Sequence, residues 1–286
     1  MSVAVVTGSN KGIGLAIVRA LCKKFSGDVY LTSRDEGRGK EAIESLEKEG
    51  LHPKFHCLDI CNEETVEKLR DFMKEKYGGI DVLVNNAGIA FKNAATEPFG
   101  VQAKVTLATN YWANKRTCEI LFPVLKPGAR VVNLSSSAGY LGHLGARGGD
   151  KVKAEQLRNT LAAPDLSLET LDGLMKNFVE TAQAGTHGDY GWPNSTYVVS
   201  KIGWSALSRI QQKMMEADPR DDIVVNHVHP GYVDTDMTSH KGPLTPDQGA
   251  VSSVFAALLP PKTEIRGAYL WYDCQIVDWV NGPLPA

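Results

Sequence analysis

The sequence predicts an α/β fold in which helices cover both faces of one parallel sheet, a doubly wound arrangement. Short apolar runs typical of buried parallel strands alternate with amphipathic helical segments from Val3 onward. A glycine-rich turn joins the first strand directly to the first helix. The length of 286 residues, with 43% hydrophobic and 22% charged residues, fits a single domain at the upper end of domain size. We therefore expect one domain over residues 1–286.

Charge and cysteine usage restrict the classes of partner. The formal net charge of −2 gives no argument for a nucleic acid or an anionic membrane as a partner. The five cysteines are scattered and form no CxxC pair, which suits reduced thiols in a cytosolic protein. The first strand begins at Val3, without room for a signal segment, and no apolar run reaches membrane-spanning length. We expect a cytoplasmic protein that binds neither nucleic acid nor membrane.

The first strand and helix form a dinucleotide-binding pattern. The strand is expected over 3–7, and the helix that follows carries Leu15, Ile17, Val18 and Leu21. The turn between them reads Gly8-Ser9-Asn10-Lys11-Gly12-Ile13-Gly14. Glycines in such a turn let the backbone approach a pyrophosphate at the helix N-terminus, as in Rossmann-type folds. A tight strand-to-helix turn without a ligand is the alternative.

The second strand, expected over 29–33, ends where the fold selects its cofactor. In an NAD site an acidic side chain about 20 residues after the last glycine would hold the ribose 2′-hydroxyl. Here the cations expected beside the ribose are Lys11, Arg34 and Arg38. Three cations favour a 2′-phosphate, and therefore NADP(H) over NAD(H). Asp35 and Glu36 are the competing signal, but they are better placed to open the next helix.

The next units repeat the strand-helix pattern. Helices are expected over 40–49 and 63–77, and strands over 54–58 and 81–84. Asp59 and Ile60 follow the first of these strands, where the Asp59 carboxylate could reach an adenine amino group or cap the next helix. The loop Asn85-Asn86-Ala87-Gly88 follows the second strand.

The second half of the chain carries further polar groups at strand ends. A helix over 104–121 includes Asn110, and a strand over 129–134 delivers Ser135, Ser136 and Ser137. Strands are also expected over 223–228 and 269–271. His227 and His229 share one face of the first of these strands, but no third ligand has suitable spacing, so we expect no metal site.

Tyr197 and Lys201 are four residues apart, so on a helix they lie one turn apart on the same face. An ammonium group beside a phenol stabilises the phenolate and lowers its pKa from about 10 toward neutral pH. A tyrosine with such a pKa can donate or accept a proton. An ordinary amphipathic helix is the alternative for this pattern taken alone.

Four motifs in this order resemble the short-chain dehydrogenase/reductases: the glycine-rich turn, the loop at 85–88, Ser136 and Tyr197-x-x-x-Lys201. The segments 6–14, 83–92 and 191–193 are similar to the monomeric NADPH carbonyl reductases. The resemblance implies a catalytic set of Asn110, Ser136, Tyr197 and Lys201. The family motif places the catalytic hydroxyl three residues after the strand asparagine Asn133, which selects Ser136, with Ser135 as the other choice.

The same resemblance implies the cofactor and substrate contacts. The residues expected to hold NADPH or NADP⁺ are Gly8, Asn10, Lys11, Gly12, Ile13, Gly14, Arg34, Arg38, Asp59, Ile60, Asn86, Ala87, Gly88, Tyr197, Lys201, Pro230, Gly231, Val233 and Thr235. The residues expected to contact substrate are Ser136, Ala138, Tyr197 and Tyr232. Tyr232 and His229 stand where relatives often carry Trp and Cys, and Ala138 replaces a bulkier residue, so the substrate range is open.

The resemblance also implies the reaction, which is the reduction of aldehydes, ketones and quinones to alcohols by hydride transfer. Tyr197 would donate the proton and Ser136 would polarise the carbonyl group. Lys201 would lower the tyrosine pKa and hold the nicotinamide ribose, while Asn110 would bind a water of the proton relay. Implied substrates are xenobiotic quinones and carbonyls, with prostaglandins, steroids and glutathione conjugates as further classes.

Residues 140–190 exceed what a minimal repeat of strand and helix needs. Ser167 is placed to cap a helix that carries apolar residues on one face. In carbonyl reductases such an insertion covers the helices that tetrameric relatives use for association, so the resemblance implies a monomer. Three other functions stay open: a narrow-specificity hydroxysteroid or prostaglandin ketone reductase, an NADPH-binding sensor without turnover, and an epimerase or dehydratase on the same fold.

Overall fold

The computed structural model describes residues 1–92, 94–146, 148–282 and 284–285, and the strands of these residues form one sheet. The order is β3-β2-β1-β4-β5-β6-β7-β8, and all neighbouring strands are parallel except β7 and β8. The strands are β1 (Val3–Val6), β2 (Asp28–Ser33), β3 (Lys54–Cys57), β4 (Ile80–Asn85), β5 (Leu125–Leu134), β6 (Val224–Val228), β7 (Tyr269–Leu270) and β8 (Ile276–Val277). The strand order reverses between β1 and β4, which is where such folds bind ligands.

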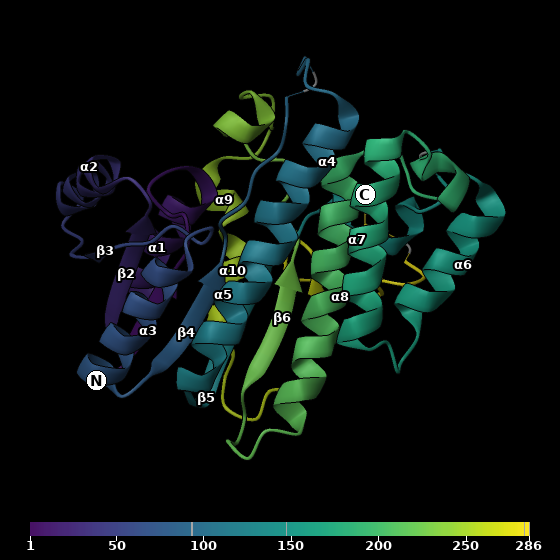
Figure 1. Cartoon of the computed structure of the whole chain (residues 1–286). Coiled ribbons are helices and arrows are strands. Elements are labelled where there is room, and N and C mark those ends of the chain that lie inside the picture. The colour runs from purple at the N-terminus through teal and green to yellow at the C-terminus, as the bar shows by residue number, and fades with distance from the viewer. Residues whose placement is uncertain (93, 147, 283, 286) are drawn as a thin grey trace.

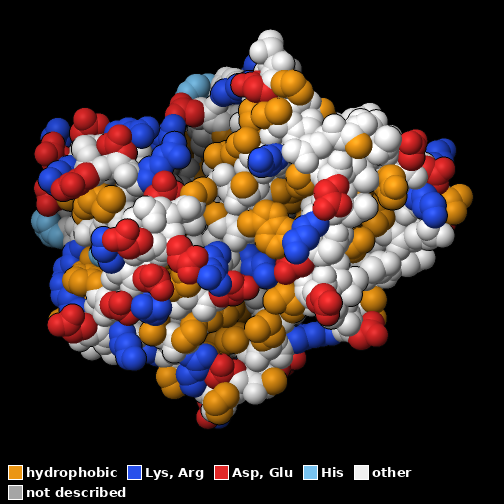
Figure 2. All heavy atoms as spheres, in the orientation of Figure 1, with side chains coloured by type: hydrophobic (Ala, Val, Ile, Leu, Met, Phe, Trp, Pro, Cys, Tyr) orange, Lys and Arg blue, Asp and Glu red, His pale blue; other side chains and the backbone are white. Residues whose placement is uncertain are grey.

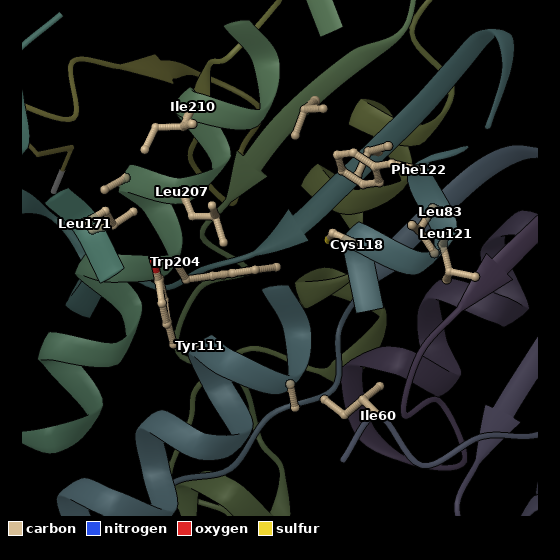
Figure 3. Close-up of a cluster of buried hydrophobic side chains, with 14 of the residues drawn as sticks. Ile60, Leu83, Tyr111, Cys118, Leu121, Phe122, Leu171, Trp204, Leu207 and Ile210 are labelled. Carbon is tan, nitrogen blue, oxygen red and sulfur yellow. The ribbon is translucent and has the colours of Figure 1, made fainter. Parts of the chain in front are cut away.

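Helices cover both faces of the sheet (Figure 1). They are α1 (Gly12–Lys24), α2 (Glu36–Glu47), α3 (Glu63–Tyr77), α4 (Phe99–Leu107), α5 (Asn114–Leu121), α6 (Lys151–Ala162), α7 (Leu168–Ala184), α8 (Thr196–Glu216), α9 (Pro246–Gly249) and α10 (Val251–Ala257). One core contains residues of α3, α4, α5, α7 and α8, and the other contains residues of α1, α2 and α10. Figure 3 shows part of the first core, where Cys118, Leu171 and Trp204 come from three different helices. The prediction of a doubly wound fold is confirmed.

Two helices begin earlier than the sequence predicts. The helix expected over 40–49 begins at Glu36, because the Asp35 carboxylate caps it by accepting from the Arg38 backbone N–H at 2.9 Å. The helix expected over 104–121 begins at Phe99 and contains a π-helical turn at Ala108–Ala113. A widened turn of this kind carries no sequence signal that periodicity would detect.

The sheet ends in a strand that the sequence did not predict, β8, which pairs antiparallel with β7. The tight turn between them is closed by backbone hydrogen bonds between Trp271 and Gln275 and between Cys274 and Trp271, both 2.8 to 2.9 Å long. Cys274 has a φ of 70°, a left-handed conformation that usually marks Gly or Asn. Because a cysteine holds this position, the sequence gives no hairpin signal.

The insertion at 140–190 contains α6 and α7 at the right of Figure 1, where α7 packs against α8. The Ser167 hydroxyl caps α7 by accepting from the Thr170 backbone N–H at 3.1 Å, as predicted. The Asp172 carboxylate accepts from the Tyr111 hydroxyl and the Lys115 ammonium group at 2.8 and 2.9 Å. Asp172 thus ties α7 to the π-helical turn and to α5, while the apolar face of α7 packs against α4 and α8.

The surface shows no large area of one charge sign on the face drawn in Figure 2, where basic and acidic side chains are interspersed. Among the described residues, no helix combines the length and the apolar character that crossing a membrane requires.

Candidate active site

The site forms at the carboxyl edge of β1 and β4, where the glycine-rich turn meets the loop after β4. The Asn86 side-chain amide donates to the backbone carbonyls of Thr7 and Gly8, both at 2.9 Å. The Thr7 hydroxyl accepts from the backbone N–H groups of Asn86 and Ala87 at 3.0 Å. A Cβ on Gly8 would lie 3.0 Å from the Cα atom of Ala87, and the φ of Gly8 is 59°. The turn therefore requires glycine here, because both the space and the backbone angle exclude a side chain.

The N-terminus of α1 has the properties of a phosphate site. No side chain caps it, and its first turn contains no acidic residue. By contrast, side chains cap α2, α3, α7 and α8, namely Asp35, Asn62, Ser167 and Ser195. Uncapped N–H groups at the positive end of a helix dipole attract an anion. The residues of this turn therefore fit the pyrophosphate of a dinucleotide.

The segment after β6 reaches the same turn. Thr235 lies beside Gly12, where an added Cβ would be 3.4 Å from the Thr235 methyl carbon. Pro230 and Val233 are buried, while Gly231 is partly exposed. The structure thus brings the predicted cofactor residues of 230–235 next to the glycine-rich turn.

The three cations predicted beside the adenosine ribose are engaged differently. Lys11 forms an ion pair of 2.6 Å with Asp236, and Arg38 forms one of 3.1 Å with Asp35. Arg34 is exposed and has no side-chain ion pair or hydrogen bond among the described residues. Arg34 is therefore available to a phosphate without the loss of an existing ion pair.

Asp59 neither caps α3 nor is left free. Its carboxylate accepts from the Cys61 backbone N–H at 3.0 Å, and α3 is capped by Asn62 instead. Of the two roles that the sequence left open for Asp59, helix capping is wrong. Ile60, the next residue, is buried.

Ser136 and Tyr197 meet although they are far apart in the sequence. The Ser136 hydroxyl forms a hydrogen bond with the Tyr197 phenol and also accepts from the Ala138 backbone N–H at 3.1 Å. The Ser135 hydroxyl instead lies 2.6 Å from the Ser205 hydroxyl, within the packing of α8. Of the two serines, Ser136 is therefore the one placed to act with Tyr197.

The Lys201 ammonium group is buried between α8 and the end of β5. It donates to the Leu134 carbonyl at 2.7 Å and lies 5.7 Å from the centroid of the Tyr197 ring. Burial lowers the pKa of Lys201 to about 8. Burial also raises the pKa of Tyr197, and the hydrogen bond from Ser136 offsets only part of that rise. The pKa of Tyr197 is thus raised overall, because the loss of water around the phenol is the larger of these two effects.

Asn110 lies in the π-helical turn and joins the site's segments. Its side-chain oxygen accepts from the Ile89 backbone N–H at 2.8 Å, and its amide donates to the Ile89 carbonyl and the Ser200 hydroxyl at 2.9 and 3.1 Å. An added Cβ on Gly88 would lie 3.2 Å from the Asn110 oxygen and 3.9 Å from the Lys201 nitrogen. Asn110 and Lys201 therefore flank the same loop.

The substrate side of the site is more open. Ala138 is partly buried in a short helix after Ser136, and Tyr232 is 52% exposed. Sequence reasoning missed Tyr269, whose hydroxyl donates to the Ser136 carbonyl at 2.6 Å, and Trp279, whose indole donates to the Gly139 carbonyl at 2.6 Å. No sequence signal links residues this distant. Among the described residues, no group of three or more side chains could hold a metal ion.

The fold and these residues define the class of protein. The sequence profile described as short chain dehydrogenase matches residues 2–148, and the chain belongs to this family. It is 46% identical to carbonyl reductase (NADPH) 1 of Rattus norvegicus over 278 residues, which are 97% of this chain and 98% of the relative. Its identity to carbonyl reductase (NADPH) 1 of Homo sapiens is 48% over 278 residues, with the same shares.

A solved structure resembles this one closely. Salutaridine reductase from Papaver somniferum superposes with a TM-score of 0.82 and is 30% identical in sequence. The match covers 96% of this chain and 100% of the salutaridine reductase chain.

The buried Lys201 predicts an unusual stability change. Below its pKa of about 8, Lys201 is charged in the folded and unfolded states, so the folded state carries the full cost of burying the ammonium group. That cost corresponds to about 3 kcal/mol, less about 1 kcal/mol for the hydrogen bond to Leu134. We expect Lys201→Met to raise the free energy of unfolding by about 2 kcal/mol at pH 7.

The sign of the pH dependence follows from the lowered pKa. As pH rises from 8 toward 10.4, folded Lys201 loses its proton before the unfolded chain does, so the wild type gains stability and the advantage of the variant disappears. Urea unfolding at pH 7 and near pH 10 measures both values. Lys68→Met, at an exposed lysine, is the control and should stay within about 0.5 kcal/mol of wild type. A Lys201→Met variant less stable than wild type at pH 7 would contradict the assignment.

Proposed function

We propose that this protein is an NADPH-dependent carbonyl reductase that converts aldehydes, ketones and quinones to alcohols. The observation that carries the proposal is the hydrogen bond between Tyr197 and Ser136, with buried Lys201 beside them. These groups lie on the sheet edge that also holds the glycine-rich turn and the uncapped α1 N-terminus. The names of the two curated relatives, which are nearly half identical over almost the whole chain, support the same activity and cofactor.

The residues divide the work of a reduction. Bound NADPH supplies the hydride, which is the chemistry of the cofactor itself. Ser136 donates a hydrogen bond to the carbonyl oxygen and so stabilises the charge that develops there. Tyr197 donates its phenolic proton to the same oxygen as it becomes an alkoxide. Lys201 holds the ribose hydroxyls, and a water on Asn110 returns a proton from solvent to Tyr197.

The raised pKa of Tyr197 determines the protonation state in which this residue meets the substrate. A phenol that keeps its proton at neutral pH is ready to donate to an alkoxide, which reduction requires. At neutral pH Tyr197 therefore carries the proton that it donates in the proposed reduction.

Finer features of the proposal rest on single observations. We infer a monomer, because α7 covers α4 and α8, and we place the protein in the cytoplasm, in line with its scattered free cysteines.

Glutathione conjugates belong to the proposed substrate range, with quinones and simple carbonyls. A narrow ketone specificity is the second candidate, since the structural neighbour is named for one compound, salutaridine.

NADPH oxidation against menadione, an aromatic aldehyde and a hydroxysteroid ketone, with NADH in parallel, tests the function. We expect turnover of the quinone and the aldehyde with a strong preference for NADPH. Turnover of the steroid ketone alone would favour the narrow-specificity candidate. Tight NADPH binding without turnover of any compound would contradict the proposal and indicate a cofactor-binding sensor.

Tyr197→Phe removes the proposed proton donor and little else. We expect kcat to fall by at least 10³-fold, because the alkoxide then has no positioned acid, while the Kd for NADPH changes by less than about threefold. Fluorescence titration measures binding, and NADPH oxidation measures turnover. Tyr190→Phe, at an exposed tyrosine, is the matched control and should behave like wild type. Wild-type turnover by Tyr197→Phe would remove it from the reaction.

Arg34→Ala tests recognition of the 2′-phosphate. We expect the KM for NADPH to rise by about 10-fold or more and the KM for NADH to change little, because only NADPH carries the phosphate. Lys68→Ala changes the net charge equally at an exposed position on α3 and serves as control. Equal increases for both cofactors would show that Arg34 does not recognise the 2′-phosphate.

A further inference from the structure

The backbone that carries Ser136 is held by side chains from distant parts of the chain. The Tyr269 hydroxyl donates to the Ser136 carbonyl at 2.6 Å, and the Nδ1 atom of His229 accepts from the Ser137 N–H at 2.9 Å. His143 contacts the Ser137 carbonyl through Nε2 at 3.0 Å, and the Trp279 indole donates to the Gly139 carbonyl at 2.6 Å. We call residues 136–139 the serine segment.

Tyr269 and His229 are themselves fixed by the sheet. Tyr269 belongs to β7, and His229 directly follows β6, whose residue His227 pairs with Tyr269 across the two strands. The His227 ring stacks on Tyr269 with centroids 4.8 Å apart. The Trp271 ring lies 4.3 Å from that of His229. Tyr269 is 1% exposed and His229 is 7% exposed, so neither ring can move without displacing its neighbours.

Both groups keep one protonation state near neutral pH. Burial raises the pKa of Tyr269, so its hydroxyl remains a donor. Burial lowers the pKa of His229 to about 4, so the ring is neutral and Nδ1 can accept the Ser137 N–H. The two hydrogen bonds therefore persist over the pH range in which enzymes of this kind work.

The Ser136 carbonyl does not need Tyr269 for hydrogen bonding alone. It also accepts from the Gly139 backbone N–H at 2.8 Å, within the short helix of the serine segment. The added bond from β7 ties this local turn to the sheet. Since the Ser136 hydroxyl must meet both Tyr197 and a substrate oxygen, a displacement of about 1 Å would lower the rate by up to about 100-fold.

We propose that Tyr269 and His229 are positioning residues that fix the serine segment, and with it the Ser136 hydroxyl, against Tyr197 for carbonyl reduction. The inference rests on the proposed function, because positioning is measured through turnover. Neither side chain donates a proton to substrate. Their effect passes through the backbone of Ser136 and Ser137.

Tyr269→Phe tests the first hydrogen bond with the ring kept in place. We expect kcat to fall by about 10-fold or more, while the KM for NADPH and the thermal midpoint stay near wild type. Tyr30→Phe is the matched control. Tyr30 is another buried strand tyrosine, on β2, and its hydroxyl forms a hydrogen bond of 3.0 Å with the Tyr77 hydroxyl. A wild-type kcat for Tyr269→Phe would overturn the proposal.

A double-mutant cycle separates positioning from a merely structural role. In a Ser136→Ala background, at enzyme concentrations high enough to follow the slow reaction, Tyr269→Phe should lower kcat no further. An equal fold-loss in both backgrounds would contradict action through Ser136. His229→Asn, which retains an acceptor near the Nδ1 position, should keep more activity than His229→Leu, which has none. Equal activity of these two variants would overturn the part of the proposal that concerns His229.

Turnover by the wild-type enzyme separates failure of the positioning proposal from failure of the proposed function. If wild type oxidises NADPH with a carbonyl substrate but Tyr269→Phe does the same at an equal rate, only the positioning proposal falls. If wild type turns over no carbonyl compound of the panel, the proposed function falls, and the positioning proposal falls with it.

Discussion

The site depends on one buried ammonium group. Lys201 bridges from α8 to the carbonyl of Leu134, the last residue of β5, and so joins the helix of Tyr197 to the strand that leads into Ser136. An ion this deep in the protein costs several kcal/mol unless it has partners. Its partial compensation by one carbonyl leaves donors that can bind other groups, such as ribose hydroxyls. The burial of Lys201 thus lowers the free energy of unfolding and at the same time places an ammonium group in the site.

Around Lys201, side-chain hydrogen bonds join loops and helices. The pairing of the strands alone would only bring these segments near one another. Asn110 joins the loop after β4 to α8, and Asn86 joins the same loop to the glycine-rich turn. Tyr269 extends the arrangement to β7, so that the strand next to the edge strand β8 also contacts the Ser136 backbone. The reaction needs two hydroxyl groups and a cofactor in fixed relative positions. Contacts from several strands hold these positions.

The sequence predicts correctly those features that residues close together in the chain determine. The alternation of strands and helices, the cap of α7 by Ser167 and the role of Asp35 at the start of α2 follow from residues close in the chain. The choice of Ser136 over Ser135 follows from a family motif, and the hydrogen bond to Tyr197 agrees with it.

The rest depends on contacts between distant residues. The ion pair between Lys11 and Asp236 spans 225 positions, and the bond between Tyr269 and Ser136 spans 133. Neither leaves a trace in spacing or composition. The direction of the Tyr197 pKa also escaped the sequence, because it depends on how far the phenol is removed from water, which only packing determines.

The most direct test of this account is a crystal structure of the protein with NADP⁺. The account predicts the nicotinamide ring beside the Tyr197 hydroxyl, the ribose hydroxyls within about 3.2 Å of the Lys201 nitrogen, and the 2′-phosphate on Arg34. A dinucleotide bound in the opposite orientation, or with its nicotinamide away from Tyr197 and Ser136, would contradict the account.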